Sequence, residues 1–112
     1  MGVSKAYRER VMGQLAPVGT IRARNMFGEI GLYTDDQLFG MMVDEGVYFK
    51  VDDTNRAAYE AEGIGPFVAP WTGKPTSYYA VPEAVLADPE RLGEWVAQAV
   101  AVAARKPKKK KR

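Results

Sequence analysis

The chain has 112 residues, of which 46% are hydrophobic and 27% are charged, a composition typical of a single globular domain with one core. It contains no cysteine and no histidine, which excludes disulfides, thiolate chemistry and the side chain most often used for acid–base catalysis and zinc binding. Six of the 16 basic residues lie in residues 106–112, so the rest of the chain carries 10 basic and 14 acidic residues, a net charge of −4.

The sequence contains no apolar run long enough to cross a bilayer, and its N-terminal residues have no apolar signal core. We therefore expect a cytoplasmic protein without membrane contact. No motif for a cofactor or metal is present, so we predict no cofactor, no metal site and no catalytic residues.

The first half of the chain predicts one helix followed by a meander. Ser4 can cap a helix over 5–16, and the apolar face of this helix carries Tyr7, Val11, Met12 and Leu15. Alternation then predicts a strand over 20–33 that bends near Gly28. Short turns connect it to strands over 38–43 and 47–51, which together form an antiparallel meander.

The second half predicts a short helix over 55–61, capped by Asp52 or Asp53, and then a hairpin formed by residues 67–71 and 76–81. Pro70 lacks an N–H, so the strand over 67–71 is expected to be short or at an edge. The last helix begins at Asp88-Pro89 and has the most regular helical spacing, shown by Leu92, Trp95, Val96, Ala99, Val100 and Ala103.

This order of elements predicts an α+β fold with two layers, an antiparallel sheet of about five strands packed with three helices. We expect residues 1–105 to form the domain and residues 106–112 to be a disordered basic tail. Strand 38–43 is apolar on both alternating faces, which an antiparallel sheet with one solvated face does not require. Helices and loops that cover both faces would explain this pattern, and so would a homodimer.

Residues 22–33, RARNMFGEIGLY, suggest several kinds of site. A G-x-x-G loop that clamps nucleotides lies between helices, whereas here the flanks are extended and Glu29 would repel phosphate. The P-loop pattern is absent, and the pattern of an RNA-recognition motif matches only out of register. The glycines are better explained by a bulge or a bend in a strand.

Arg22 and Arg24 share a face of this strand, so we name them as a candidate surface for a partner or an anion. Pairing with acidic residues, such as Glu29 or an aspartate of a turn, is the explanation that we favour over binding of a ligand. Tyr78, Tyr79 and Trp71 are candidates for stacking, although alternation directs at least one tyrosine into the core. The adjacent acids in the turns are interpreted as turn and cap residues rather than metal ligands.

The basic tail is the candidate for contact with nucleic acid, without sequence specificity. Its cations are Lys106, Lys108, Lys109, Lys110, Lys111 and Arg112.

Three segments together resemble the N-terminal domain of the TfoX/Sxy family of regulators of competence-specific genes. They are RARNMFGEIGLY, LFGMMVDEGVYFKVDDTNRAAYEAEGIGPF and SYYAVPEAVLADPERLGEW. The resemblance covers about residues 15–100 and implies a two-layer α/β domain with an antiparallel sheet. This chain has a lysine tail where the named regulators continue into a second domain, and it has Asp35-Asp36-Gln37 where the family commonly has an Asp-Gly turn.

The resemblance implies a role linked to transcription, because family regulators are thought to act on competence promoters with the cyclic-AMP receptor protein. It implies no catalytic residues. We therefore expect a non-enzymatic regulator of transcription or competence that acts through a protein partner of the transcription machinery, with contact to nucleic acid through the tail. The alternatives are a domain that binds a small ligand and a homodimeric interaction module.

Overall fold

The computed structural model describes residues 3–26, 29–70 and 72–105. Its elements are α1 (Lys5–Leu15), β1 (Arg22–Met26), β2 (Glu29–Thr34), β3 (Gln37–Val43), β4 (Gly46–Lys50), α2 (Arg56–Glu60), β5 (Pro66–Ala69), β6 (Lys74–Ala80), α3 (Glu83–Leu86) and α4 (Pro89–Ala104). The strands described form one antiparallel sheet in the order β1-β2-β3-β4-β6-β5. The predicted α+β class with an antiparallel sheet is confirmed.

The prediction of a single bent strand over 20–33 is wrong. The chain turns back on itself, so that β1 and β2 pair antiparallel with Met26 opposite Glu29. This arrangement places Ala23 opposite Leu32, so both halves direct their small or apolar side chains toward the core. The described sheet therefore has six strands rather than about five. Gly28, where the bend was expected, lies outside the described residues.

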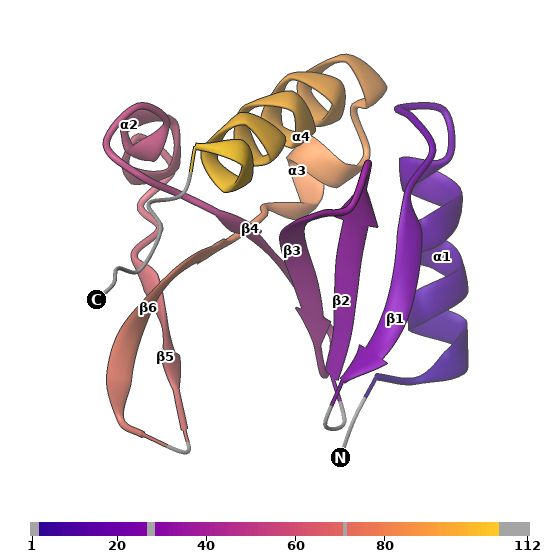
Figure 1. Cartoon of the computed structure of the whole chain (residues 1–112), viewed down its shortest axis with the longest axis horizontal. Coiled ribbons are helices and arrows are strands. Elements are labelled where there is room, and N and C mark those ends of the chain that lie inside the picture. Colours follow the sequence, from indigo (N-terminus) through magenta and orange to yellow (C-terminus); the bar gives the residue numbers. More distant parts are fainter. Residues whose placement is uncertain (1–2, 27–28, 71, 106–112) are drawn as a thin grey trace.

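The core lies on one face of this sheet, where all four described helices contribute buried residues (Figure 1). The amphipathic pattern predicted for α4 is confirmed, although Val100 of the predicted face is only partly buried and Val102 is buried instead. The buried residues of α4 are Leu92, Trp95, Val96, Ala99, Val102 and Ala103. At ~1.5–3 kcal/mol for each large apolar side chain, burial of α4 against the sheet is a major part of the stability. Figure 1 also shows the β5–β6 hairpin projecting away from the helices.

An irregularity in β3 explains why both faces of this strand are apolar in sequence. Leu32 pairs with Gly40 and Tyr33 pairs with Leu38, so Phe39 is an extra residue in β3. The bulge allows Phe39 and Met42 to enter the same core, although a regular strand would place them on opposite faces. Gly40 permits the close packing here, because a Cβ atom at this position would lie 2.7 Å from the carbonyl oxygen of Tyr48.

The helix caps follow the predictions at two positions and differ at a third. Ser4 accepts a hydrogen bond from the Tyr7 amide, and Asp88 accepts from the amides of Glu90 and Arg91. Asp52 and Asp53 do not cap α2, because the N-cap position is occupied by Asn55. The structure also contains α3, a short helix between Pro82 and Ala87 that was not predicted from the sequence.

Candidate functional site

The face of the sheet opposite the core, called the open face below, carries aromatic and basic side chains. Cross-strand pairs place Arg24, Gly31, Met41, Tyr48 and Ala80 in one row across the sheet. Tyr33, Lys50 and Tyr78 lie on the same face, because their strand neighbours Leu32, Phe49 and Tyr79 point into the core.

The sheet curves toward the open face. The rings of Tyr48 in β4 and Phe67 in β5 have centroids 4.7 Å apart, although β6 lies between the two strands. Burial raises the pKa of Tyr78, and the nearby Tyr33 and Glu29 of β2 raise it further. Side chains from distant strands therefore approach one another on this face. The curvature explains why Met41 is only 7% exposed although it is not part of the core cluster.

Two cation–π pairs lie near the two sides of the open face. The guanidinium carbon of Arg24 lies 5.8 Å from the ring centroid of Tyr33, and Nζ of Lys50 lies 4.7 Å from that of Tyr78. Each pair places a positive charge beside a partly exposed aromatic ring. The face thus combines flat apolar surfaces with cations.

The structure places both predicted arginines, Arg22 and Arg24, on the exposed side of β1. Nη2 of Arg22 lies 3.2 Å from Oδ1 of Asp36 in the β2–β3 turn, so the expected pairing with a turn aspartate is present. Asp35 and Asp36 both have positive φ angles, as the tight hairpin turn requires. Arg24 instead lies over Tyr33, as described above. Their proposed role in binding a partner or an anion stays a prediction.

The tyrosine pair divides between the two faces. Tyr79 is buried in the core and its ring lies 5.6 Å from that of Tyr59, whereas Tyr78 is on the open face. Tyr33 and Lys50 were not among the site residues predicted from the sequence. The signal was present in the alternation of VYFKV, which separates Lys50 from Val47, Phe49 and Val51. Trp71 and the tail residues Lys106, Lys108, Lys109, Lys110, Lys111 and Arg112 lie outside the described residues.

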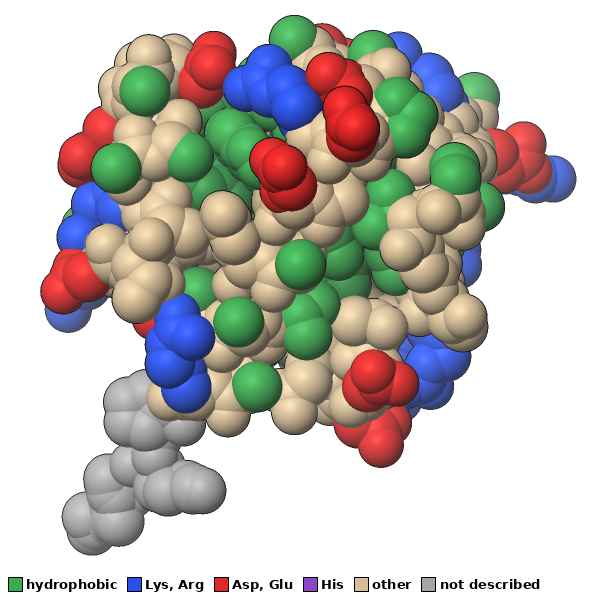
Figure 2. Space-filling view, turned by 90° about the horizontal axis from the view of Figure 1, so that it is seen from above, with side chains coloured by type: hydrophobic (Ala, Val, Ile, Leu, Met, Phe, Trp, Pro, Cys, Tyr) green, Lys and Arg blue, Asp and Glu red, His purple; other side chains and the backbone are tan. Residues whose placement is uncertain are grey.

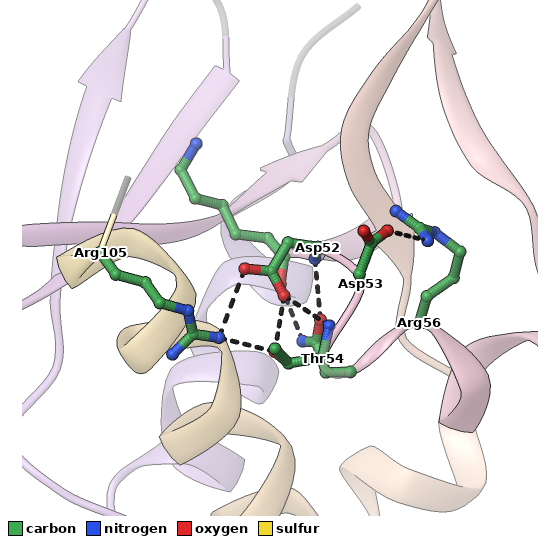
Figure 3. A network of polar contacts seen from close by, with 7 residues as sticks. Asp52, Asp53, Thr54, Arg56 and Arg105 are labelled. Atoms are coloured by element: carbon green, nitrogen blue, oxygen red, sulfur yellow. Dashed lines mark hydrogen bonds and ion pairs between the residues drawn. The ribbon is translucent and has the colours of Figure 1, made fainter. Parts of the chain in front are cut away.

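A polar network fixes the segment between β4 and α2 to the end of α4 (Figure 3). Arg105 donates through Nη2 to Oγ1 of Thr54 at 2.6 Å and to Oδ2 of Asp52 at 3.3 Å. Asp52 in turn accepts hydrogen bonds at Oδ1 from the amide and hydroxyl of Thr54, at 2.8 and 2.6 Å. Asp53 forms an ion pair with Arg56.

The buried amide of Asn55 completes this network. Its Oδ1 accepts from the Asp52 amide at 2.9 Å, and its Nδ2 donates to the carbonyl oxygen of Lys50 at 3.2 Å. The hydrogen bonds from Thr54 lower the pKa of Asp52, and Arg105 lowers it further. The aspartates here therefore hold a turn in place, which agrees with their interpretation as turn residues. The network also fixes the end of β4 that carries Lys50.

The helix side of the molecule has a different character. Seen from above, acidic and basic side chains lie close together there, with apolar side chains between them (Figure 2). Arg91 of α4 pairs with Glu62 at 3.2 Å, and Arg10 of α1 pairs with Glu83 at 2.9 Å. On this side many cations have nearby acidic partners.

A pocket of about 240 Å³ lies where the start of α1 meets the β1–β2 hairpin. It is lined by Val3, Lys5, Arg8, Asn25, Glu29 and Ile30. Burial raises the pKa of Glu29, and Asp44 raises it further. Within the described ranges, no three acidic side chains are grouped as a metal site would require, and no helix is long and apolar enough to cross a membrane.

Comparison with known proteins identifies relatives over almost the whole chain. An uncharacterised 12.7 kDa protein in the trpE 5′ region of Spirochaeta aurantia is 30% identical, over 99% of this chain and 93% of that protein. The TfoX N-terminal domain matches residues 13–103, a range that contains every described strand and most of the helical residues. The chain therefore belongs to the TfoX N-terminal domain family.

Proposed function

We propose that the protein is a non-enzymatic regulator of transcription that acts through a protein partner, with its basic tail contacting nucleic acid. The observation that carries this proposal is membership of the TfoX N-terminal domain family across residues 13–103. The side chains gathered on the open face, aromatic rings with adjacent cations, also suit binding to another macromolecule.

The charge distribution supports the proposed role of the tail. Residues 106–112 carry six cations, whereas the rest of the chain has a net charge of −4. If all six cations contact phosphates of a duplex, log Kd should change with log salt with a slope of about 5, at ~0.9 per contact. A fourfold increase in salt should then weaken binding roughly a thousandfold.

The test of the tail compares the full chain with a variant of equal length in which the six basic residues of 106–112 are glutamine. Binding to duplex DNA is measured by fluorescence anisotropy at several salt concentrations. We expect the steep salt dependence only for the unchanged chain. Equal affinity and equal slope for both proteins would remove the tail from the proposed function.

The test of the partner is affinity capture from the native cytoplasm, with and without nuclease. We expect a component of the transcription machinery to be retained after nuclease treatment, and binding to be reproduced with the purified component. Capture that disappears with nuclease, or a retained protein unrelated to transcription, would contradict a role through a protein partner.

A second candidate function is binding of a small ligand in the pocket between α1 and the β1–β2 hairpin. The juxtaposition of Lys5 and Arg8 with Glu29 in one pocket favours a small ligand that carries charge. Thermal-shift measurements with metabolites and nucleotides test it, using Arg8→Gln as the variant. No stabilisation by any compound would exclude this function for the compounds tried.

A further inference from the structure

The open face differs in charge from the rest of the described protein. In strands β1 to β4 and the part of β6 that pairs with β4, its charged residues are Arg22, Arg24, Lys50 and Glu29. Arg22 is paired with Asp36 of the adjoining turn, so Arg24 and Lys50 against Glu29 leave the open face with a net charge of +1, within a described chain whose net charge is −4. Because cations gather on one face of an acidic body, this face is complementary to a polyanion.

The same face presents aromatic rings beside these cations. Tyr33 lies next to Arg24, and Tyr78 lies next to Lys50, at the ring-to-cation distances of 5.8 and 4.7 Å. Tyr33 and Tyr78 stand on β2 and β6, three strand spacings apart, which corresponds to roughly 14 Å in a flat sheet. The curvature of the sheet shortens this separation. The open face thus carries two pairs of an aromatic ring and a cation, one on β1 and β2 and the other on β4 and β6.

We propose that the open face binds single-stranded nucleic acid, with bases on Tyr33 and Tyr78 and phosphates at Arg24 and Lys50. Single-stranded nucleic acids are bound where aromatic side chains stack the bases and nearby cations follow the backbone. An antiparallel sheet with one uncovered face is a known platform for this, because its outward side chains can stack two or three bases. A duplex hides the faces of its bases and cannot use these rings.

The acidic residues around the open face determine the direction in which a nucleic-acid strand crosses it. Asp35 and Asp36 lie in the turn at one end of the β-strands, whereas Asp44 and Glu45 lie in the turn at the other end, close to Glu29. A polyanion that followed the β-strands would meet one of these groups. The nucleic acid therefore crosses from β1 toward β6, between the two turns.

The experiment measures anisotropy of a labelled oligothymidine of about ten nucleotides, within the ~4–16 nucleotides that one such platform covers. The proteins are full-length chains, and a duplex of equal length is the comparison. Tyr33→Leu and Tyr78→Leu should each weaken binding of the single strand by about 5- to 150-fold, the range measured for loss of one stacked base. Arg24→Gln should lower the salt slope by ~0.7.

The chain offers a matched control on the helix side. Arg91 lies 5.8 Å from the ring centroid of Trp95, the same distance as Arg24 from the ring centroid of Tyr33. Arg91→Gln removes the same charge from the same kind of pair and should leave oligonucleotide binding unchanged. Circular dichroism shows whether each variant is folded, and the exposed Arg24→Gln substitution tests the proposal even if a tyrosine variant unfolds.

Any one of four results would overturn the proposal. Arg24→Gln could behave like Arg91→Gln, or the duplex could bind as tightly as the single strand does to the chain whose six tail cations are glutamine. Substituting glutamine for the basic residues of 106–112 could abolish all binding while the face variants match the unchanged chain. In addition, light scattering that shows a dimer dissociated by Tyr33→Leu would assign the face to a second copy instead. None of these results bears on a protein partner in transcription.

Discussion

Tyr59 of α2 is a fully buried residue whose hydroxyl has no hydrogen-bond partner among the described residues. Its ring packs against Trp95 with centroids 4.4 Å apart, and burial raises its pKa. The ring therefore stabilises the contact between α2 and α4, whereas the hydroxyl carries an uncompensated desolvation cost.

Tyr59→Phe should increase the free energy of unfolding by about 1 kcal/mol, because it removes the unpaired hydroxyl and keeps the ring. Urea denaturation followed by fluorescence measures this change. Tyr59→Leu is the control that also removes the ring, and it should destabilise the protein. A loss of stability in Tyr59→Phe would mean that the hydroxyl is satisfied in solution.

The raised pKa of Glu29 should make the stability of the protein depend on pH. Burial and, to a smaller extent, Asp44 raise the pKa of Glu29 in the folded protein. In the unfolded chain the pKa of a glutamate is about 4.3. At pH values between these two pKa values, the folded state therefore binds more protons than the unfolded state. Stability is therefore lost as pH rises from the unfolded pKa through the raised folded pKa.

Glu29→Gln should remove this loss, making the variant more stable than the unchanged chain at neutral pH but not near pH ~4. Urea denaturation at both pH values measures the difference. Glu45→Gln, in the exposed turn, is the matched control for the change in net charge. An equal effect of Glu29→Gln at both pH values would contradict the assigned cause.

At the scale of elements, the start of α4 rests on one capping side chain. Asp88 accepts hydrogen bonds from the amides of Glu90 and Arg91 at 3.1 and 3.3 Å, directly before Pro89. Because α4 packs most of its length on the sheet, a weaker start affects the whole domain.

Asp88→Ala should lower the free energy of unfolding by about 1 kcal/mol, the usual cost of losing such a cap. Asp88→Ser retains a hydroxyl acceptor at the same position and should recover most of this loss. Thermal or urea denaturation compares the three proteins. Equal destabilisation by alanine and serine would show that the carboxylate acts through its charge rather than as a cap.

The elements that the sequence predicted correctly are those in which local chemistry decides. The N-cap at Asp88 and the apolar spacing of α4 are both local, and both agree with the structure. The turn at Asp35 and Asp36 is likewise local. The hairpin of β1 and β2 was missed, because alternation continues through residues 20–33 and only pairing distinguishes one strand from two.

The candidate site was predictable only in part for the same reason. Arg22 and Arg24 could be assigned to one face from their spacing, but their neighbours across the sheet depend on register. The bulge at Phe39 shifts that register, and the curvature of the sheet brings Tyr78 near Tyr33 from another strand. The ion pair between Arg105 and Asp52 joins residues that are far apart in sequence, and no local sequence pattern indicates such a contact.

At the scale of the whole molecule, charge and shape are divided between two sides. The helices bury the core and carry many of the ion pairs, whereas the open face collects cations and rings. The basic tail follows Arg105, which the polar network fixes near the end of β4 that carries Lys50. The two regions proposed to contact nucleic acid therefore begin close together, although they lie far apart in sequence.

The position of α4 at the end of the described chain also affects how the protein is made. Leu92, Trp95, Val96, Ala99 and Ala103 belong to the same core cluster as the strands and α1. During synthesis α1, the strands, α2 and α3 emerge first, and the part of the core that α4 covers stays exposed until this helix leaves the ribosome. We therefore expect the domain to complete its folding only after α4 has been synthesised.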